Sequence, residues 1–327
     1  MFKRSGKLII LVVLILILLI LNLLLGSVKI PVSDTLRILF GDNSNEIFSN
    51  IILKSRLPQA LVAIVAGAGL AVSGLQMQTI FRNPLAGPSV LGISSGASLG
   101  VAMVVLVSSS VAGVSLSRIG YAGDAAISVA AIIGSLAVMA LIVYVARKVK
   151  GNVTLLIIGV MIGYLVTAIV GVLKFFSSEE DVKAYVVWGL GSFARVSGDQ
   201  MLLFVTMMIL LLPFSFLLIK SLNLMLLGDD YAKNLGLNVS KSRTLVILNS
   251  GVLVAIVTAY CGPIMFIGLA VPHLCRAIFR TSDHKILVPG TMLTGAALAL
   301  ICSLVARMPG FEGALPVNSV TAPCRWV

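Results

Sequence analysis

Long apolar runs recur along almost the whole chain, and they constrain its fold more than any other sequence feature. They lie near 8–26, 57–78, 89–107, 124–146, 153–173, 200–220, 241–260, 264–279 and 286–306, and a further run starts near 315. Inside a bilayer only helices and closed barrels satisfy their own backbone hydrogen bonds. Since a helix needs about 20 apolar residues to cross, these runs predict an all-α, polytopic transmembrane helical bundle. We expect about nine full spans plus a truncated tenth.

The composition leaves little sequence for a soluble domain. Of the 327 residues, 59% are hydrophobic and only 11% are charged, which is far from the usage of soluble globular domains. We therefore expect a single membrane-spanning domain over residues 1–327. Its first apolar run is longer than the 7–15 residues typical of a cleavable signal peptide, and it is interpreted as a retained first helix.

The charge pattern indicates orientation rather than nucleic-acid binding. The net charge is +12, but the basic residues fall between apolar runs and form no single stripe or patch. If the spans alternate in direction, most basic residues lie on the side of the N-terminus, which predicts a cytoplasmic N-terminus. The four cysteines are far apart and contain no C-x-x-C pair, so neither a metal site nor a disulfide framework is indicated.

The second apolar run opens on a basic residue. Arg56 stands where this helix would enter the membrane, so it could extend to lipid headgroups or bind an acidic partner. Further along, Ala63, Gly67 and Ala71 repeat at four-residue spacing. Such a face lets helix backbones approach closely in lipid, which favours tight packing inside the bundle.

Prolines interrupt two apolar regions. Pro84 and Pro88 break any helix after the second run, and Pro263 and Pro272 predict a short or kinked helix. The stretch 92–97 is small and polar at membrane depth. Irregular backbone is tolerated there only inside protein or beside a watery cavity, so a re-entrant turn and a pathway wall both remain open.

A short polar segment near 228–238 reads as a surface helix. Asp229 or Asp230 would cap it and Gly236 would end it. It is too short to span a membrane and would be marginal by itself. It should therefore pack against the underside of the membrane domain or against a soluble partner.

Several catalytic and energising motifs are missing from the sequence. There is no G-x-x-x-x-G-K-[ST] loop to bind nucleotide phosphates, and no Asp, Glu or Lys lies near the middle of a predicted span, as a proton- or sodium-coupled carrier would commonly require. No nucleophile, base or metal constellation points to an enzyme. Uphill transport would need energy from elsewhere, and an ATP-independent carrier or channel for a small solute remains an alternative.

One ordered series of motifs covers residues 50 to 322, and by it the chain resembles the FecCD-type permeases of ABC importers. The motifs are Arg56-Leu57-Pro58, Gly74-x-x-x-Gln78, Arg82-Asn83-Pro84-Leu85-Ala86-x-Pro88, Leu91-Gly92-Ile93-x-x-Gly96-Ala97, Trp188-x-x-Gly191-Ser192, Ala232-x-x-Leu235-Gly236, Gly262-Pro263-Ile264-x-Phe266-Ile267-Gly268-Leu269-x-x-Pro272-His273 and Leu315-Pro316-Val317.

The resemblance implies a subunit of an importer for iron-siderophore, haem or cobalamin in the bacterial cytoplasmic (inner) membrane. It implies a bundle of ten helices that works as a homodimer with two separate ATPase subunits. Those subunits use ATP and Mg²⁺, and this chain binds no cofactor and no metal. A periplasmic or lipoprotein substrate-binding protein would deliver the substrate.

The resemblance also implies roles for individual residues. The ATPase-coupling residues are Asp229, Asp230, Ala232, Leu235 and Gly236. Arg56 and Arg307 would bind the substrate-binding protein at the outer face, and the cytoplasmic gate would contain Asn83, Leu85 and Asn152.

Two positions depart from the family pattern. Gln59 stands where many relatives carry a further arginine, so one docking charge is absent. After Ala322, where relatives continue with a glycine-rich tenth helix, the chain ends in Pro323-Cys324-Arg325-Trp326-Val327. We expect this last segment to enter from the outside, to pack its Leu315 and Val317 face on neighbouring helices, and to leave the groove of the tenth helix unfilled.

Overall fold

The computed structural model describes residues 2–26, 28–41, 45–112, 121–149, 151–196, 198–307 and 315–321, and every regular element in these ranges is helical. The longer helices are α1 (Phe2–Leu24), α4 (Leu57–Phe81), α5 (Ile93–Ala112), α6 (Tyr121–Lys148), α7 (Asn152–Phe175), α9 (Asp199–Leu211), α13 (Val239–Cys261), α14 (Ile267–Phe279) and α15 (His284–Ala306). The shorter elements are α2 (Val32–Leu39), α3 (Glu46–Ile51), η1 (Ile52–Arg56), η2 (Pro88–Leu91), α8 (Glu179–Gly189), η4 (Phe193–Arg195), α10 (Phe214–Leu217), α11 (Ile219–Leu226), α12 (Asp229–Asn234) and α16 (Val317–Thr321).

Seven helical stretches within the described residues are long and apolar enough to cross a membrane. One of them joins α3, η1 and α4 into the continuous stretch Glu46–Phe81. The predicted runs at 89–107 and 264–279 correspond to the shorter apolar helices Ile93–Val107 and Ile267–Phe279. The all-helical bundle is confirmed, and the short or kinked helix predicted from Pro263 and Pro272 corresponds to α14, a short helix that contains Pro272. The count of nine full spans plus a tenth stays a prediction.

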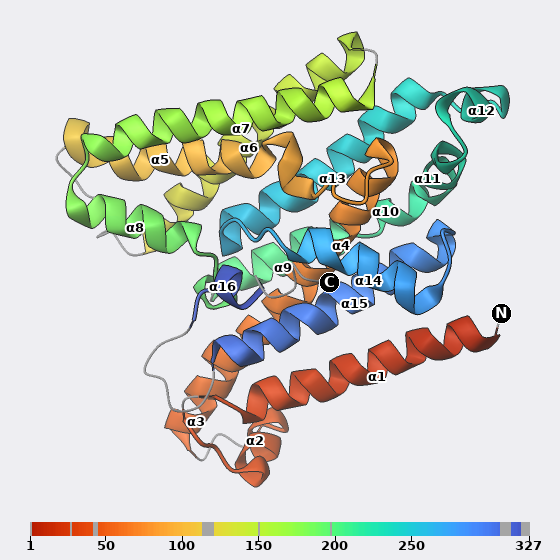
Figure 1. The fold of residues 1–327 in the computed structure, drawn as a ribbon. Coiled ribbons are helices and arrows are strands. Elements are labelled where there is room, and N and C mark those ends of the chain that lie inside the picture. Colours follow the sequence, from red (N-terminus) through yellow and green to blue (C-terminus); the bar gives the residue numbers. More distant parts are fainter. Residues whose placement is uncertain are drawn as a thin grey trace.

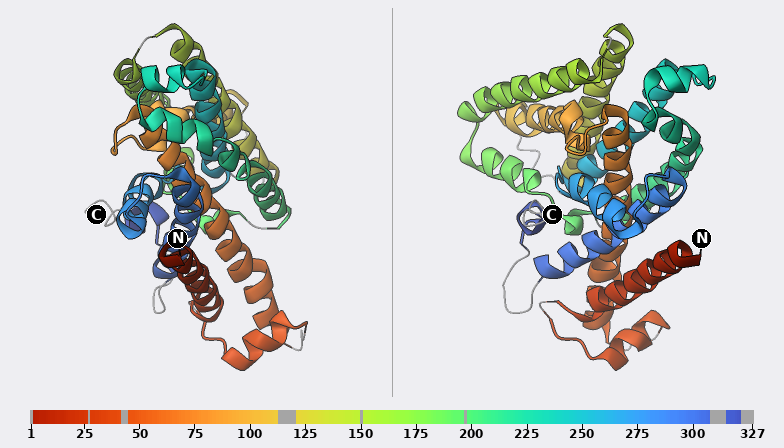
Figure 2. Two further views of the ribbon diagram at one scale, coloured as in Figure 1. Left: turned by 90° about the vertical axis from the view of Figure 1, so that its right-hand side faces the viewer. Right: turned by 45° about the vertical axis from the view of Figure 1, so that its right-hand side comes forward.

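Helix α4 forms the centre of the bundle, with α13, α14 and α15 packed around it (Figure 1). Helices α5, α6 and α7 pack together on one side, and α1 lies along α15 on the other (Figures 1 and 2). The N-terminus of α1 and the short helix α12 lie at the same end, whereas α2 and α3 lie at the opposite end.

Small residues allow α4 and α15 to cross closely. A methyl group on Gly67 would come within 2.4 Å of the Gly295 carbonyl oxygen, and one on Gly295 would come within 2.5 Å of the Ala71 Cβ. Such a contact brings two backbones together, which is how helices pack in lipid without help from the hydrophobic effect. The predicted packing role of the small-residue face is thereby confirmed.

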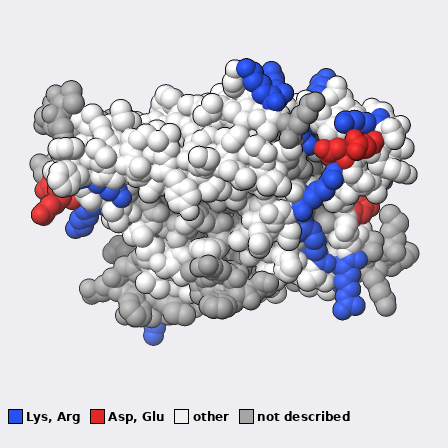
Figure 3. All heavy atoms as spheres, turned by 45° about the horizontal axis from the view of Figure 1, so that its top comes forward, with Lys and Arg blue, Asp and Glu red and all other residues white. Residues whose placement is uncertain are grey.

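Charged residues gather toward the two ends of the molecule. Figure 3 shows a broad uncharged band between these ends on the face drawn there. Charges inside a bilayer are costly, so this distribution is typical of a chain whose central band faces hydrocarbon.

The last described segment is only partly as expected. Val317 is buried, and its amide donates to the Gly191 carbonyl at 3.1 Å. Asn318 Nδ2 donates to the Pro263 carbonyl at 2.6 Å. Leu315, which precedes α16, is exposed instead of packed. Residues 322–327 lie outside the described part of the chain.

Candidate functional site

A carboxylate on α12 links this surface helix to the membrane bundle. Asp229 Oδ1 accepts a hydrogen bond from Arg82 Nη2 at 2.6 Å, and its Oδ2 accepts one from Arg243 Nη2 at 2.7 Å. Arg82 is the C-cap of α4 and Arg243 lies in the second turn of α13. One carboxylate therefore joins α12 to the ends of two long helices.

The N-terminal cap of α12 differs from the prediction. The N-cap is Gly228, which has φ of 115° and no side chain to cap with. Asp229 belongs to the first turn instead, because two arginines hold its carboxylate away from the helix amides. The predicted stop is confirmed, since Gly236 has the left-handed φ of 83° that glycine adopts without strain.

The other predicted coupling residues divide into a buried anchor and an exposed surface. Ala232 is fully buried, whereas the Asp230 side chain is 98% exposed and reaches only Lys233, at 3.4 Å. Leu235 is an exposed apolar residue. The five predicted coupling residues thus lie on α12 and the turn that ends it. Asp229 and Ala232 hold the helix against the bundle, whereas Asp230 and Leu235 face outward.

Two exposed apolar residues extend this surface and were missed by sequence reasoning. Leu227 and Tyr231 are 60% and 57% exposed, close to the 54% of Leu235. Tyr231 and Leu235 stand four residues apart, a spacing that places side chains on one side of a helix, and Leu227 ends α11 just before the turn at Gly228. That spacing was available in the sequence, but exposure at a polar end of the bundle became visible only in the fold. We call Leu227, Tyr231 and Leu235 the α12 apolar stripe.

The loop after α4 contains the predicted gate residues Asn83 and Leu85. Asn83 Oδ1 accepts from the Leu85 amide at 2.9 Å, so the side chain shapes the turn that precedes η2. The Leu85 side chain is exposed. Helix α7 begins at the third gate residue, Asn152, whose side chain lies outside the described part of the structure. The structure therefore shows the contact between Asn83 and Leu85, and the place of Asn152 in the gate stays a prediction.

A buried amide fastens α4 to α14 just inside this loop. Gln78 Nε2 donates to the Leu269 carbonyl at 3.0 Å, and Arg276 Nη1 donates to Gln78 Oε1 at 2.6 Å. These bonds connect positions 191 and 198 residues apart in the sequence. The turn at the end of α4 is consequently held on both sides, by α12 and by α14.

At the opposite end of α4, Arg56 is buried. Only 3% of the residue is exposed. Its Nη1 donates to the carbonyls of Leu23 and Leu24 at 2.6 and 2.9 Å, and its Nη2 donates to the carbonyl of Val28. The last carbonyls of a helix lack intrahelical partners and carry partial negative charge. Arg56 therefore completes the C-terminal end of α1, and its role in docking stays a prediction.

Arg307, the second predicted docking residue, reaches the same end of α1. Its Nη2 donates to Asn22 Oδ1 at 2.6 Å. Burial, and to a lesser degree the nearby charge of Arg56, lower the pKa of Arg307 to about 10, so the Arg307 guanidinium stays charged at neutral pH. In the described part of the chain neither arginine has a carboxylate partner. The two arginines thus meet around α1 instead of standing free at the outer face.

A polar cavity of about 270 Å³ opens between α5, α7 and α8. Lys174 Nζ lies 4.7 Å from the centre of the Tyr185 ring in its wall. The small polar stretch singled out in the sequence begins α5, and its Ser95 faces this cavity, so the pathway-wall interpretation is favoured there. The lining residues are Ser95, Ser98, Val166, Thr167, Val170, Gly171, Lys174 and Tyr185.

Apolar helices, a polar cavity beside them and a surface helix anchored to the central span together define a multi-span membrane permease. The chain belongs to the FecCD transport family, whose model matches residues 14–323. This is the family that the motif series indicated.

Similar proteins cover most of this chain. It is 36% identical over 302 residues to the hemin transport system permease protein HmuU of Yersinia pestis, covering 92% of this chain and 88% of that protein. It is 35% identical over 270 residues to the vitamin B12 import system permease protein BtuC of Klebsiella pneumoniae, covering 82% and 77%. A solved structure described as a metal-chelate type ABC transporter in an inward-facing conformation covers 98% of this chain and 95% of its own, with 30% identity and a TM-score of 0.82.

Proposed function

We propose that this chain is the permease subunit of a binding-protein-dependent ABC importer for iron-siderophore, haem or cobalamin. The observation that carries the proposal is the similarity, along almost the whole chain, to permeases named for hemin and vitamin B12. Hemin and vitamin B12 are both bulky compounds that contain a chelated metal. The structural relative is likewise described as an ABC transporter of the metal-chelate type. The chain acts as a single membrane-spanning domain in the bacterial inner membrane, with its N-terminus in the cytoplasm beside α12.

Energy enters through separate ATPase subunits that use ATP and Mg²⁺. Each binds the α12 apolar stripe together with Asp230 and the turn at Gly236. Support comes from the exposure of apolar side chains at an otherwise polar end of the bundle, since such exposed groups mark interaction sites. Ala232 and Asp229 hold α12 against α4 and α13, so movement of the helix reaches the turn that contains Asn83 and Leu85.

The substrate moves along the polar cavity between α5, α7 and α8, and a second copy of the chain forms the other wall. This homodimer is supported by α7, since only 22% of its apolar 18-residue window is buried within one copy and the helix contributes five residues to the cavity. The substrate-binding protein docks at the outer end, where Arg56 and Arg307 supply positive charge. Asn152 belongs to the cytoplasmic gate.

Uptake of labelled ferric siderophore, haem and cobalamin by a deletion strain tests the proposal. We expect one of the three to require this chain and its ATPase. The purified chain in vesicles without an ATPase should accumulate none of them. Nucleotide-independent accumulation would instead establish a carrier or channel, and unchanged uptake of all three in the deletion strain would remove the importer function.

A further inference from the structure

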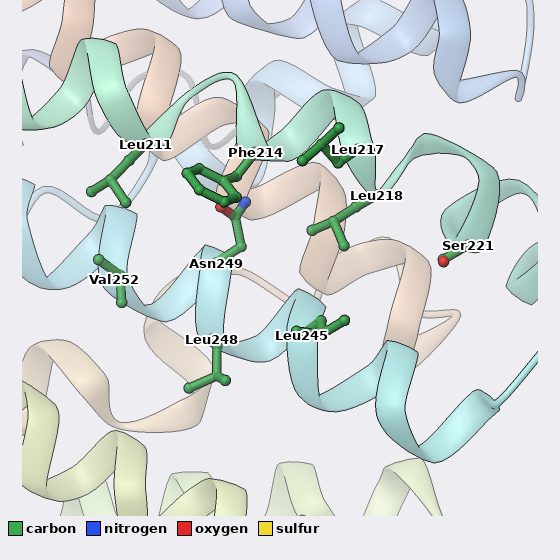
Figure 4. A pocket seen from close by; sticks show the side chains of 9 residues that line it. All are labelled: Leu211, Phe214, Leu217, Leu218, Ser221, Leu245, Leu248, Asn249 and Val252. Carbon is green, nitrogen blue, oxygen red and sulfur yellow. The ribbon is translucent and has the colours of Figure 1, made fainter.

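A groove runs along the bundle between α13 and the broken helix formed by α9, α10 and α11. Its volume is about 470 Å³. Pro213 separates α9 from α10, and this break opens the space because proline cannot continue a regular helix. The lining side chains are Leu211, Phe214, Leu217, Leu218 and Ser221 from one wall and Leu245, Leu248, Asn249 and Val252 from the other. Figure 4 shows Phe214 and Asn249 pointing toward one another from the two walls.

The groove faces hydrocarbon. Phe214, Leu217 and Leu245 in its walls are exposed, and all three belong to candidate membrane spans. Asn249 Nδ2 donates hydrogen bonds to Gln76 Oε1 at 3.1 Å and to Ser215 Oγ at 2.9 Å. This polar group is therefore directed into the protein. The remaining lining is almost entirely aliphatic or aromatic, which suits a hydrocarbon chain.

Two lysines flank the end of the groove that lies toward α12. Ser242 Oγ approaches Ser221 Oγ to 3.5 Å and brings the two walls together there. Lys220 and Lys241 precede these serines and are both exposed. Lys241 also stands four residues before Leu245, so it continues the groove-lining face of α13 by one turn.

These lysines are free to bind an anion. No other described residue forms a hydrogen bond or salt bridge with either ammonium group. Arg243, two residues further along α13, is by contrast held by Asp229 at 2.7 Å. A basic group at the cytoplasmic end of a gap between transmembrane helices attracts an anionic lipid headgroup.

We propose that this groove binds an anionic phospholipid, with one acyl chain between α13 and α9–α11 and the phosphate held by Lys220 and Lys241. A second copy of the chain fits less well. Pairing two copies through this face would bring the same unneutralised lysines together. The site lies apart from the polar cavity and goes beyond the proposed transport function.

Native mass spectrometry of the full chain in mild detergent, titrated with phosphatidylglycerol and phosphatidylcholine, tests the site. We expect the wild-type chain to prefer phosphatidylglycerol, and K220Q/K241Q to bind it about tenfold more weakly with unchanged phosphatidylcholine binding. The matched control is R147Q/K148Q, which removes two exposed charges at the cytoplasmic end of α6 and should keep the preference. Equal binding of both lipids by the wild type, or an equal loss in the control pair, would overturn the proposal.

A second pair of variants tests the acyl-chain part. L245W places a large ring in the groove and should weaken binding of the retained lipid. L202W adds the same ring on an exposed position of α9 outside the groove and should not. If L245W retains lipid as the wild type does, or if copies of L245C cross-link to one another and bind no lipid, the groove is not a lipid site.

Discussion

The two ends of α4 carry the same residue type in opposite settings. Arg56 at one end is buried and donates to three backbone carbonyls of α1 and the turn that follows it. Arg82 at the other end is exposed and pairs with the carboxylate of Asp229. A buried guanidinium cannot leave its acceptors without stranding charged donors, whereas an exposed ion pair is weak and easily remade. The link at Arg56 is therefore structural, and the link at Arg82 is suited to change.

Helix α4 is buried enough to transmit movement between its two ends. In the apolar 18-residue window of the stretch that contains α4, 83% of the residues are buried, compared with 22% in the corresponding window of α7. A helix packed on all sides moves with its neighbours, whereas α7 is covered on one side only. This contrast explains why the proposed coupling surface is joined to α4 and not to the more exposed helix.

The largest expected effect is on the buried end. Arg56→Ala removes three charge-assisted hydrogen bonds from the end of α1, and we expect the free energy of unfolding in detergent to fall by about 3 kcal/mol. Chemical unfolding of the purified chain measures it. Arg56→Lys, which keeps the charge, should lose less. A variant as stable as the wild type would show that Arg56 has no structural role at α1.

The next effect is on partner binding at the inner end. Leu227→Ser with Tyr231→Ser shortens the α12 apolar stripe, and we expect the affinity for the ATPase to fall about tenfold. Co-purification and a binding titration measure this loss. The control pair is Leu202→Ser with Leu210→Ser, two exposed apolar residues of α9 away from α12. Insertion should be normal in both pairs, and equal affinity in both would reject the stripe as the interface.

A smaller effect separates the two neighbouring acids of α12. Asp229→Asn weakens the bonds to Arg82 and Arg243, and we expect a loss of about 1 kcal/mol in stability together with slower uptake. Asp230→Asn should change stability by less than about 0.5 kcal/mol, because its carboxylate is solvated. Thermal unfolding and transport assays distinguish them. If both variants behave alike, the link from α12 to α4 does not matter for coupling.

The smallest effect concerns docking at the outer end. Arg307→Glu should slow association of the substrate-binding protein severalfold at low salt and by less at high salt, since charges steer encounter more than they hold complexes. Stopped-flow association at two salt concentrations measures this. Lys183→Glu on α8 is the charge-matched control. Association rates that are identical for the two variants at both salt concentrations would remove Arg307 from docking.

Local pattern predicted the elements better than their contacts. The apolar runs located the spans, the spacing of Ala63, Gly67 and Ala71 indicated the face that packs on α15, and Gly236 marked the end of α12. The predicted N-cap of α12 was wrong, because the Asp229 carboxylate pairs with Arg82, 147 residues away in the sequence, and not with the amides of its own helix. Nothing in the sequence around Arg56 or Arg307 indicated that both would reach the end of α1.

Sequence alone determined that this chain crosses a membrane many times and belongs with the FecCD permeases, because transfer of an apolar segment into lipid and the order of motifs are properties of the chain itself. Tertiary structure decided which charged groups are free. Arg307 meets Asn22 across 285 residues, and Lys220 and Lys241 flank one groove only because Ser221 of α11 and Ser242 of α13 come within 3.5 Å of one another. Such pairings depend on which helices become neighbours, and that is set by close packing over the whole bundle.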